Sequence, residues 1–147
     1  MPSSTTSRIP CYLKKWIVDK PFPHILFTLR YSRYLGVIEA IVDTGSPYTV
    51  ISTKDALRLN IPIKRMRTGG SVGLAGRSFR RPKIRDVTLR FTTDEGKPHI
   101  IKLQEMVVLK PTQWNKKVIK EVQDIPSLIG IDFLEEQGFA FHYDPKN

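Results

Sequence analysis

Short segments in which apolar and polar residues alternate recur along this chain from His24 onward. A period of two residues is typical of a β-strand that buries one of its faces. Turn signals separate the segments, such as Asp-Glu-Gly at 94–96. We expect strands at 24–31, 37–42, 48–52, 87–91, 100–109 and 139–143, with a turn at 31–36 joining the first two as a hairpin. About seven short strands predict a mostly β chain that folds as a barrel or a sandwich.

A capping signal predicts a first short helix after the third strand. Ser52 is a suitable N-cap residue, and Asp55 three residues later places a carboxylate near the N-terminus of the helix. The helix should cover about 53–59, because Asn60 favours the left-handed conformation that ends helices.

The C-terminal part of the chain carries a second signal of the same kind. Asp132 is followed by Glu135, so we expect Asp132 to be the N-cap of a helix that Gly138 ends. Before it, the segment 110–124 fits no alternating pattern and is predicted to be an inserted loop or a short helix.

Length and composition predict a single cytoplasmic domain. A chain of 147 residues is typical of one domain, which we place at 21–147 after a partly flexible N-terminal extension at 1–20. No apolar run approaches the roughly 18 to 20 residues that span a bilayer, so no membrane association is expected. The Ser/Thr-rich beginning lacks the apolar core of a secretory signal. The single cysteine, Cys11, excludes an internal disulfide and is compatible with a reducing compartment.

The charge of the chain is strongly basic and unevenly distributed. The net charge is +10, and ten Lys and Arg residues stand against one acidic residue at 58–90. The sequence pI is about 9.9. Such a region attracts nucleic acid or an acidic peptide through electrostatics that do not depend on sequence. The simpler interpretation is a solvated basic surface on a soluble protein.

The most informative motif is the segment 41–51, in which Asp43 stands between two β-branched runs. This pattern predicts a strand that carries a carboxylate into an apolar interior and then turns sharply at Gly45, with Thr44 hydrogen-bonded inward. A lone buried carboxylate is costly unless it is hydrogen-bonded or shares a proton. The alternative is an ordinary aspartate in a turn at the end of a strand.

Three elements in a fixed order decide between these interpretations. They are Val-Asp-Thr-Gly-Ser at 42–46 with Thr-Val-Ile at 49–51, Val-Gly-Leu-Ala-Gly at 72–76, and Ile-Pro-Ser-Leu-Ile-Gly-Ile-Asp-Phe-Leu at 125–134. With them, the chain resembles the retropepsin-like aspartic proteases, the single-domain relatives of the retroviral proteases, over about 21–144. The resemblance implies a closed β-barrel of the retropepsin type with one or two short helices and a glycine-rich flap hairpin.

The resemblance also implies an aspartic endopeptidase with Asp43 as its catalytic residue. Aspartic proteolysis uses two carboxylates that share one proton. The chain holds one such motif and is too short for a two-lobed enzyme, so the active species should be a symmetric homodimer. Thr44, Gly45 and Ser46 would support the active-site loop. Of these, Thr44 would brace the two loops across the interface, and Gly45 would offer its backbone to the substrate.

The substrate implied by the resemblance is an extended peptide or an unfolded protein. A flap that closes over this substrate would be formed by Val72, Gly73, Leu74, Ala75 and Gly76. Arg77, Arg80 and Arg81 follow the tip of this hairpin, and their positive field should favour acidic residues near the cleavage site at low salt.

The remaining chemistry-bearing residues suggest no second site. The histidines (His24, His99 and His142) lack metal-ligand spacing, so we expect no metal and no other cofactor. Two alternatives to an enzyme stay open: a dimer that binds peptides or proteins without turnover, and a basic module that binds nucleic acid on the same scaffold. The intact Asp-Thr-Gly disfavours the first. The absence of stacked aromatic residues beside the basic run disfavours the second.

Overall fold

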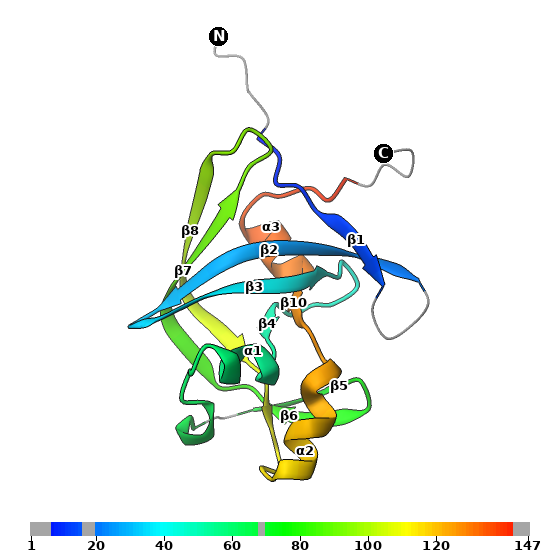
Figure 1. Cartoon of the computed structure of the whole chain (residues 1–147), viewed down its shortest axis with the longest axis vertical. Helices are drawn as coiled ribbons and strands as arrows, with labels where there is room; N and C mark the ends of the chain where they lie inside the picture. Colours follow the sequence, from blue (N-terminus) through cyan, green and yellow to red (C-terminus); the bar gives the residue numbers. More distant parts are fainter. Residues whose placement is uncertain (1–6, 16–19, 68–69, 143–147) are drawn as a thin grey trace.

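The chain is mostly β in the computed structural model, which describes residues 7–15, 20–67 and 70–142 (Figure 1). A large sheet has the strand order β1-β2-β3-β10-β4-β8-β7, and a small sheet has the order β5-β6-β9. The strands of the large sheet are β1 (Tyr12–Lys15), β2 (Pro21–Tyr31), β3 (Tyr34–Val42), β4 (Val50–Ile51), β7 (Lys83–Thr92), β8 (Pro98–Val108) and β10 (Ser127–Ile129). The expectation of a mostly β chain is therefore confirmed.

The alternating segment at 24–31 forms part of β2, which pairs antiparallel with β3 as predicted. The connection is shorter than the predicted turn, because Tyr31 pairs with Tyr34 and leaves a two-residue turn in which Ser32 has a φ of 53°. The inward residues of the hairpin include Phe27, Leu29 and Ile38, each at most 2% exposed. Alternation thus predicts the buried face of this hairpin correctly.

Strand β10 lies between β3 and β4, two strands that follow each other in the sequence. It runs parallel to β3, with Ile129 opposite Val42, and antiparallel to β4, with Leu128 opposite Val50. Strand β4 continues the sheet by pairing with β8, which pairs with β7, and β7 also pairs with the distal part of β2. This order places the segment between β3 and β4 beside the end of β10.

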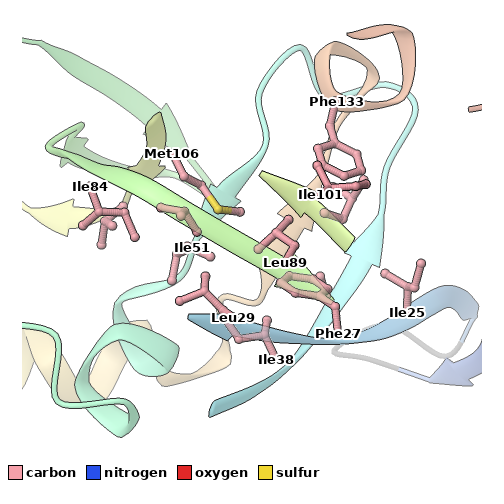
Figure 2. Packing of buried hydrophobic residues seen from close by; sticks show 14 of the residues in the cluster. Ile25, Phe27, Leu29, Ile38, Ile51, Ile84, Leu89, Ile101, Met106 and Phe133 are labelled. Atoms are coloured by element: carbon pink, nitrogen blue, oxygen red, sulfur yellow. The ribbon is translucent and has the colours of Figure 1, made fainter. Parts of the chain in front are cut away.

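The main core fills the space inside the large sheet. Figure 2 shows that side chains from β2, β3, β4, β7 and β8 form one cluster, which also includes Phe133 of helix α3 (Ile131–Glu136). Phe91 joins Phe27 and Phe133, with ring centroids 5.2 and 6.1 Å apart. Burying one such side chain contributes about 1.5–3 kcal/mol, so this cluster is the main source of stability for the scaffold.

The first helix, α1 (Thr53–Arg58), begins and ends where the sequence predicts. The side chain of Ser52 accepts a hydrogen bond from the backbone N–H of Asp55 at 3.1 Å, and Asn60 has a φ of 62°. Ser127 on β10 donates to the Asp55 carboxylate at 2.6 Å, so this buried polar group is paired. The cap therefore also attaches the helix to the sheet.

The predicted role of Asp132 as a helix cap is wrong. The N-cap residue of α3 is Gly130, and Asp132 lies in the first turn. Its carboxylate instead accepts hydrogen bonds from Thr49, 83 residues earlier in the chain. Gly138 ends the helix with a φ of 69°, as expected. The predicted strand at 139–143 is also wrong for 139–142, which form no strand, and residue 143 lies outside the described residues.

The small sheet contains the predicted glycine-rich hairpin. Strands β5 (Ser71–Leu74) and β6 (Arg77–Arg80) are joined by Ala75 and Gly76, which both have a positive φ. Such a two-residue turn matches the twist of paired strands. The predicted insertion contributes strand β9 (Lys110–Pro111), helix α2 (Lys116–Glu121) and the 3₁₀ turn η2 (Val122–Asp124), while a second 3₁₀ turn, η1 (Ile63–Arg65), follows α1.

The insertion holds the hairpin on its outer side. Strand β6 pairs with β9 as well as with β5, and Arg77 forms a 2.7 Å ion pair with Glu121 of α2. In Figure 1, α2 accordingly lies beside the hairpin at the end of the molecule opposite the chain termini. The hairpin therefore belongs to a three-stranded sheet in which β6 is the middle strand, and α2 is attached to it.

Strand β1 lies within the predicted flexible extension but is part of the large sheet. It pairs with the beginning of β2, and both Tyr12 and Lys14 donate hydrogen bonds to the Glu39 carboxylate on β3. Burial alone would raise the pKa of Glu39, but these hydrogen bonds and the lysine charge hold it below the ordinary value. Burial and the same bond to Glu39 raise the pKa of Tyr12 to about 12.

No helix in the described part of the chain is long and apolar enough to cross a membrane.

Candidate active site

Asp43 begins the loop that connects β3 to β4. Its backbone N–H donates to the carbonyl of Ile129 on β10 at 2.9 Å. Its carboxylate accepts a hydrogen bond from the N–H of Gly45 at 3.0 Å, and its carbonyl accepts one from Ser46 at 3.0 Å. The carboxylate is therefore held by a tight turn at a point where two neighbouring strands end.

In the single chain, this turn lies at the surface and not in the interior. Asp43, Thr44 and Gly45 are all exposed, so the expectation of a buried carboxylate is wrong for one copy. The expected inward hydrogen bond of Thr44 is also missing, since its side chain bonds to no residue that the structure describes. The reason is that the strand ends before Asp43, so the pleat no longer directs the side chain toward the core.

The second half of the loop is fixed from behind by the start of α3. The Ser46 carbonyl accepts a hydrogen bond from Ile131 at 2.8 Å. The Thr49 hydroxyl accepts from the N–H of Gly130 at 2.9 Å and donates to the Asp132 carboxylate at 2.8 Å, and the Thr49 N–H donates to the same carboxylate at 3.2 Å. Together these bonds attach the loop to the end of β10.

Gly130 is the residue that permits this close approach. A Cβ atom at this position would lie 2.5 Å from the carbonyl oxygen of Tyr48 and 2.7 Å from that of Ser46, distances that no side chain tolerates. Local patterns in the sequence do not assign Thr49, Gly130 or Asp132 to the site. The signal available for Gly130 was its position between an apolar strand and a helix, which indicates a backbone that must pass close to another.

A hollow of about 310 Å³ lies between this loop and the hairpin. Its lining brings together six of the predicted site residues: Asp43, Gly45, Ser46, Val72, Gly73 and Leu74. Of the others, Thr44 and Ala75 do not line it, and Gly76 lines a separate hollow of about 230 Å³ between the hairpin and the insertion. The loop and the hairpin are distant in sequence but enclose the same space.

The floor and walls of the larger hollow are mainly apolar. They are formed by Val50, Leu109 and Leu128, with Pro47 and Tyr48 from the loop. Asp43 is the acidic residue in this lining and Arg81 the basic one. An exposed carboxylate at the edge of an apolar hollow can accept a proton or activate water, but one carboxylate supplies only half of an acid–base pair.

The described residues include no cluster of three or more His, Cys, Asp or Glu side chains that could hold a metal ion.

Comparisons with known proteins agree with this geometry. A sequence model described as aspartyl protease matches residues 36–133, which include both the Asp43 loop and Gly130. A retropepsin-like aspartic protease from Rickettsia conorii has a similar structure, with a TM-score of 0.51 and 16% identity over 95% of this chain and 96% of that one. This likeness confirms the retropepsin-like fold. No curated protein matches the chain.

Two further solved structures are similar at lower scores. The EIAV protease complexed with the inhibitor HBY-793 has a TM-score of 0.49 and 17% identity, covering 88% of this chain and 100% of that one. The retroviral protease-like domain of Ddi1 from Leishmania major has a TM-score of 0.46 and 15% identity, covering 78% of each chain.

Proposed function

Because the chain belongs to the aspartyl protease family, we propose that it is a homodimeric aspartic endopeptidase that cleaves extended peptides. The observation that carries this proposal is the position of Asp43. Its carboxylate lies at the edge of a hollow that the loop and the glycine-rich hairpin line together. This arrangement offers an acid–base group beside a space of the size and polarity that suits a peptide side chain.

A second copy of the chain would supply the second carboxylate. Asp43 and Thr44 are exposed in the single chain, so both are accessible to the same loop of a partner related by a two-fold axis. In this dimer the two Asp43 carboxylates would share one proton and become buried together. Thr44, which lacks a side-chain bond among the described residues, would gain its partner across the interface.

The chemistry then follows from the shared proton. The ionised carboxylate of the pair takes a proton from water as the water attacks the peptide carbonyl, and the protonated carboxylate donates to the carbonyl oxygen. The Gly45 N–H donates a hydrogen bond to Asp43 Oδ1 at 3.0 Å and so fixes the orientation of the carboxylate. Because the two groups titrate together, the pH–rate profile belongs to the pair.

The hairpin formed by β5 and β6 is proposed to be the flap. Gly73 lines the hollow without a side chain, so its backbone is available to pair with an extended substrate in the manner of an added strand. The proposed closed barrel is supported by the additional pairing of β7 with β2. β7 is the last strand of the large sheet, and this pairing connects it back to the second strand in the order. The domain limits of 21–147 and the cytoplasmic location stay predictions.

The proposal is tested by incubating the purified protein with a denatured protein mixture between about pH 3 and 7. Asp43→Asn should abolish cleavage, because an amide can neither hold nor release the shared proton. Asp86→Asn is a matched control: Asp86 is exposed, does not line the hollow, and has a φ of 57° that asparagine also tolerates. Equal cleavage by the Asp43→Asn protein would refute the proposal. Peptide binding without cleavage by the unmodified protein would favour the silent binding dimer.

A further inference from the structure

The structure separates the three arginines that follow the hairpin tip. Arg77 is paired with Glu121 at 2.7 Å. Arg80 is exposed and does not line the hollow beside Asp43, whereas Arg81 does line it. From the sequence alone, the three are expected to act together as one positive field. Only Arg81 is positioned to contact a molecule in the hollow.

Neighbouring groups hold the Arg81 side chain in place. Its guanidinium carbon lies 5.5 Å from the centroid of the Tyr48 ring, within the range of a cation–π contact. A Cβ atom at Gly70 would lie 2.7 Å from Nη2, so the guanidinium occupies space that only glycine leaves open. The backbone N–H of Arg81 also donates to the Gly70 carbonyl at 3.1 Å, which fixes the two residues beside each other.

The charge of Arg81 is poorly compensated. The buried Nε atom has no hydrogen-bond partner among the described residues, and no acidic side chain among them forms an ion pair with Arg81. Apart from Asp43, the lining beside it is mainly apolar. A buried donor on a cation that lacks an acceptor is destabilising, and a carboxylate satisfies a guanidinium best because two of its N–H groups can bind both oxygens.

We propose that Arg81 is a specificity-determining residue that binds a carboxylate of the substrate peptide. The carboxylate is either the side chain of an aspartate or glutamate near the cleavage site or the C-terminal carboxylate of the peptide. This inference rests on the proposed function, because it takes the hollow to be the substrate-binding site. It replaces a diffuse preference for acidic peptides with a preference at one position.

Matched peptides test the inference. An extended peptide with blocked ends is prepared with glutamate or glutamine at each position in turn, and the unsubstituted peptide is also compared as free acid and amide. Binding is measured by calorimetry with the Asp43→Asn protein, and cleavage is measured with Asp43 intact. Each measurement is repeated for Arg81→Met, which keeps an apolar stem on Tyr48, and for Arg80→Met as the control. Urea unfolding verifies that both variants are folded.

At one position, or at the C-terminus, we expect the peptide with the carboxylate to be bound and cleaved about tenfold better than its matched amide peptide. This ratio of acid to amide should fall to about one in Arg81→Met but not in Arg80→Met. The preference should largely survive about 1 M salt, because a contact within the hollow is screened less than a surface field. The inference is overturned if the acid-to-amide ratio is near one for every pair of peptides. It is also overturned if Arg81→Met and Arg80→Met lower this ratio equally. Cleavage without any acid preference refutes the inference alone, and an Arg81-dependent binding preference without cleavage refutes the proposed function alone.

Discussion

The Asp132 carboxylate is predicted to stabilise the protein as a brace between two distant segments and not as a helix cap. Asp132→Ala removes the acceptor for the Thr49 N–H at 3.2 Å, for the Thr49 hydroxyl at 2.8 Å and for the Phe133 N–H at 2.8 Å. Hydrogen bonds to a charged group contribute about 1.5–3 kcal/mol each and are not additive. Phe133 lies in the first turn of the helix, where water can replace the lost bond. The loss of the two bonds from buried Thr49 dominates, and we expect Asp132→Ala to lower the free energy of unfolding by about 3 kcal/mol.

The assay is urea-induced unfolding followed by circular dichroism at one fixed protein concentration, since a dimer's stability depends on concentration. Glu135→Ala, an exposed acidic residue on the same helix, is the matched control and should change the free energy by less than about 0.5 kcal/mol. A double-mutant cycle with Thr49→Val should give a coupling energy of at least about 1 kcal/mol. A loss of about 1 kcal/mol or less for Asp132→Ala, as for a cap, together with no coupling to Thr49, would refute the brace.

Three other predictions concern the proposed dimer, the Glu39 carboxylate and Gly73. Specific activity should fall when the protein is diluted below its dimer dissociation constant, and a species that sediments as a monomer yet cleaves at full rate would contradict this. The lowered pKa of Glu39 means that its contribution to stability is present at neutral pH and is lost as the pH falls below the ordinary value of 4.5. Intrinsic amide exchange itself slows as the pH falls, so the quantity to compare is the protection factor, the intrinsic rate divided by the observed rate. The protection factors at 12–15 should therefore decrease at acidic pH, and Glu39→Gln should remove most of this decrease. Gly73→Val should reduce turnover without lowering the urea midpoint, because its Cβ has no neighbour closer than 3.9 Å but would narrow the hollow; parallel losses of both would indicate a structural role.

Local signals in the sequence predicted the elements that depend on local interactions. Alternation located β2, β3 and β7, because each strand buries one face against the same core. The capping signal at Ser52 was correct because the bond it predicts spans only three residues, to Asp55. Strand β1 was missed because it is exposed along its whole length and therefore has no alternating pattern.

The errors arose where a contact between distant residues decides the outcome. Asp132 has the local pattern of an N-cap, but Thr49 approaches it through the pairing of β10 with β3 and β4, which no local pattern shows. The motif predicted which residues share the candidate site, and six of them do line one hollow. It did not predict that Asp43 would be exposed in one copy or that Arg81 would join the lining, since both depend on where strands end in three dimensions.

In the proposed flap, the position of β6 between β5 and β9 would limit how fast the hollow opens. A free two-stranded tip moves as a loop does, within nanoseconds to microseconds. Here, moving the tip means separating β6 from β9 and breaking the Arg77–Glu121 ion pair, or displacing α2 together with the hairpin. Collective motion of several packed elements takes microseconds to milliseconds. Entry and departure of a peptide should therefore follow the slow, joint movement of the hairpin and the insertion, so substitutions in α2 can change turnover without touching the hollow.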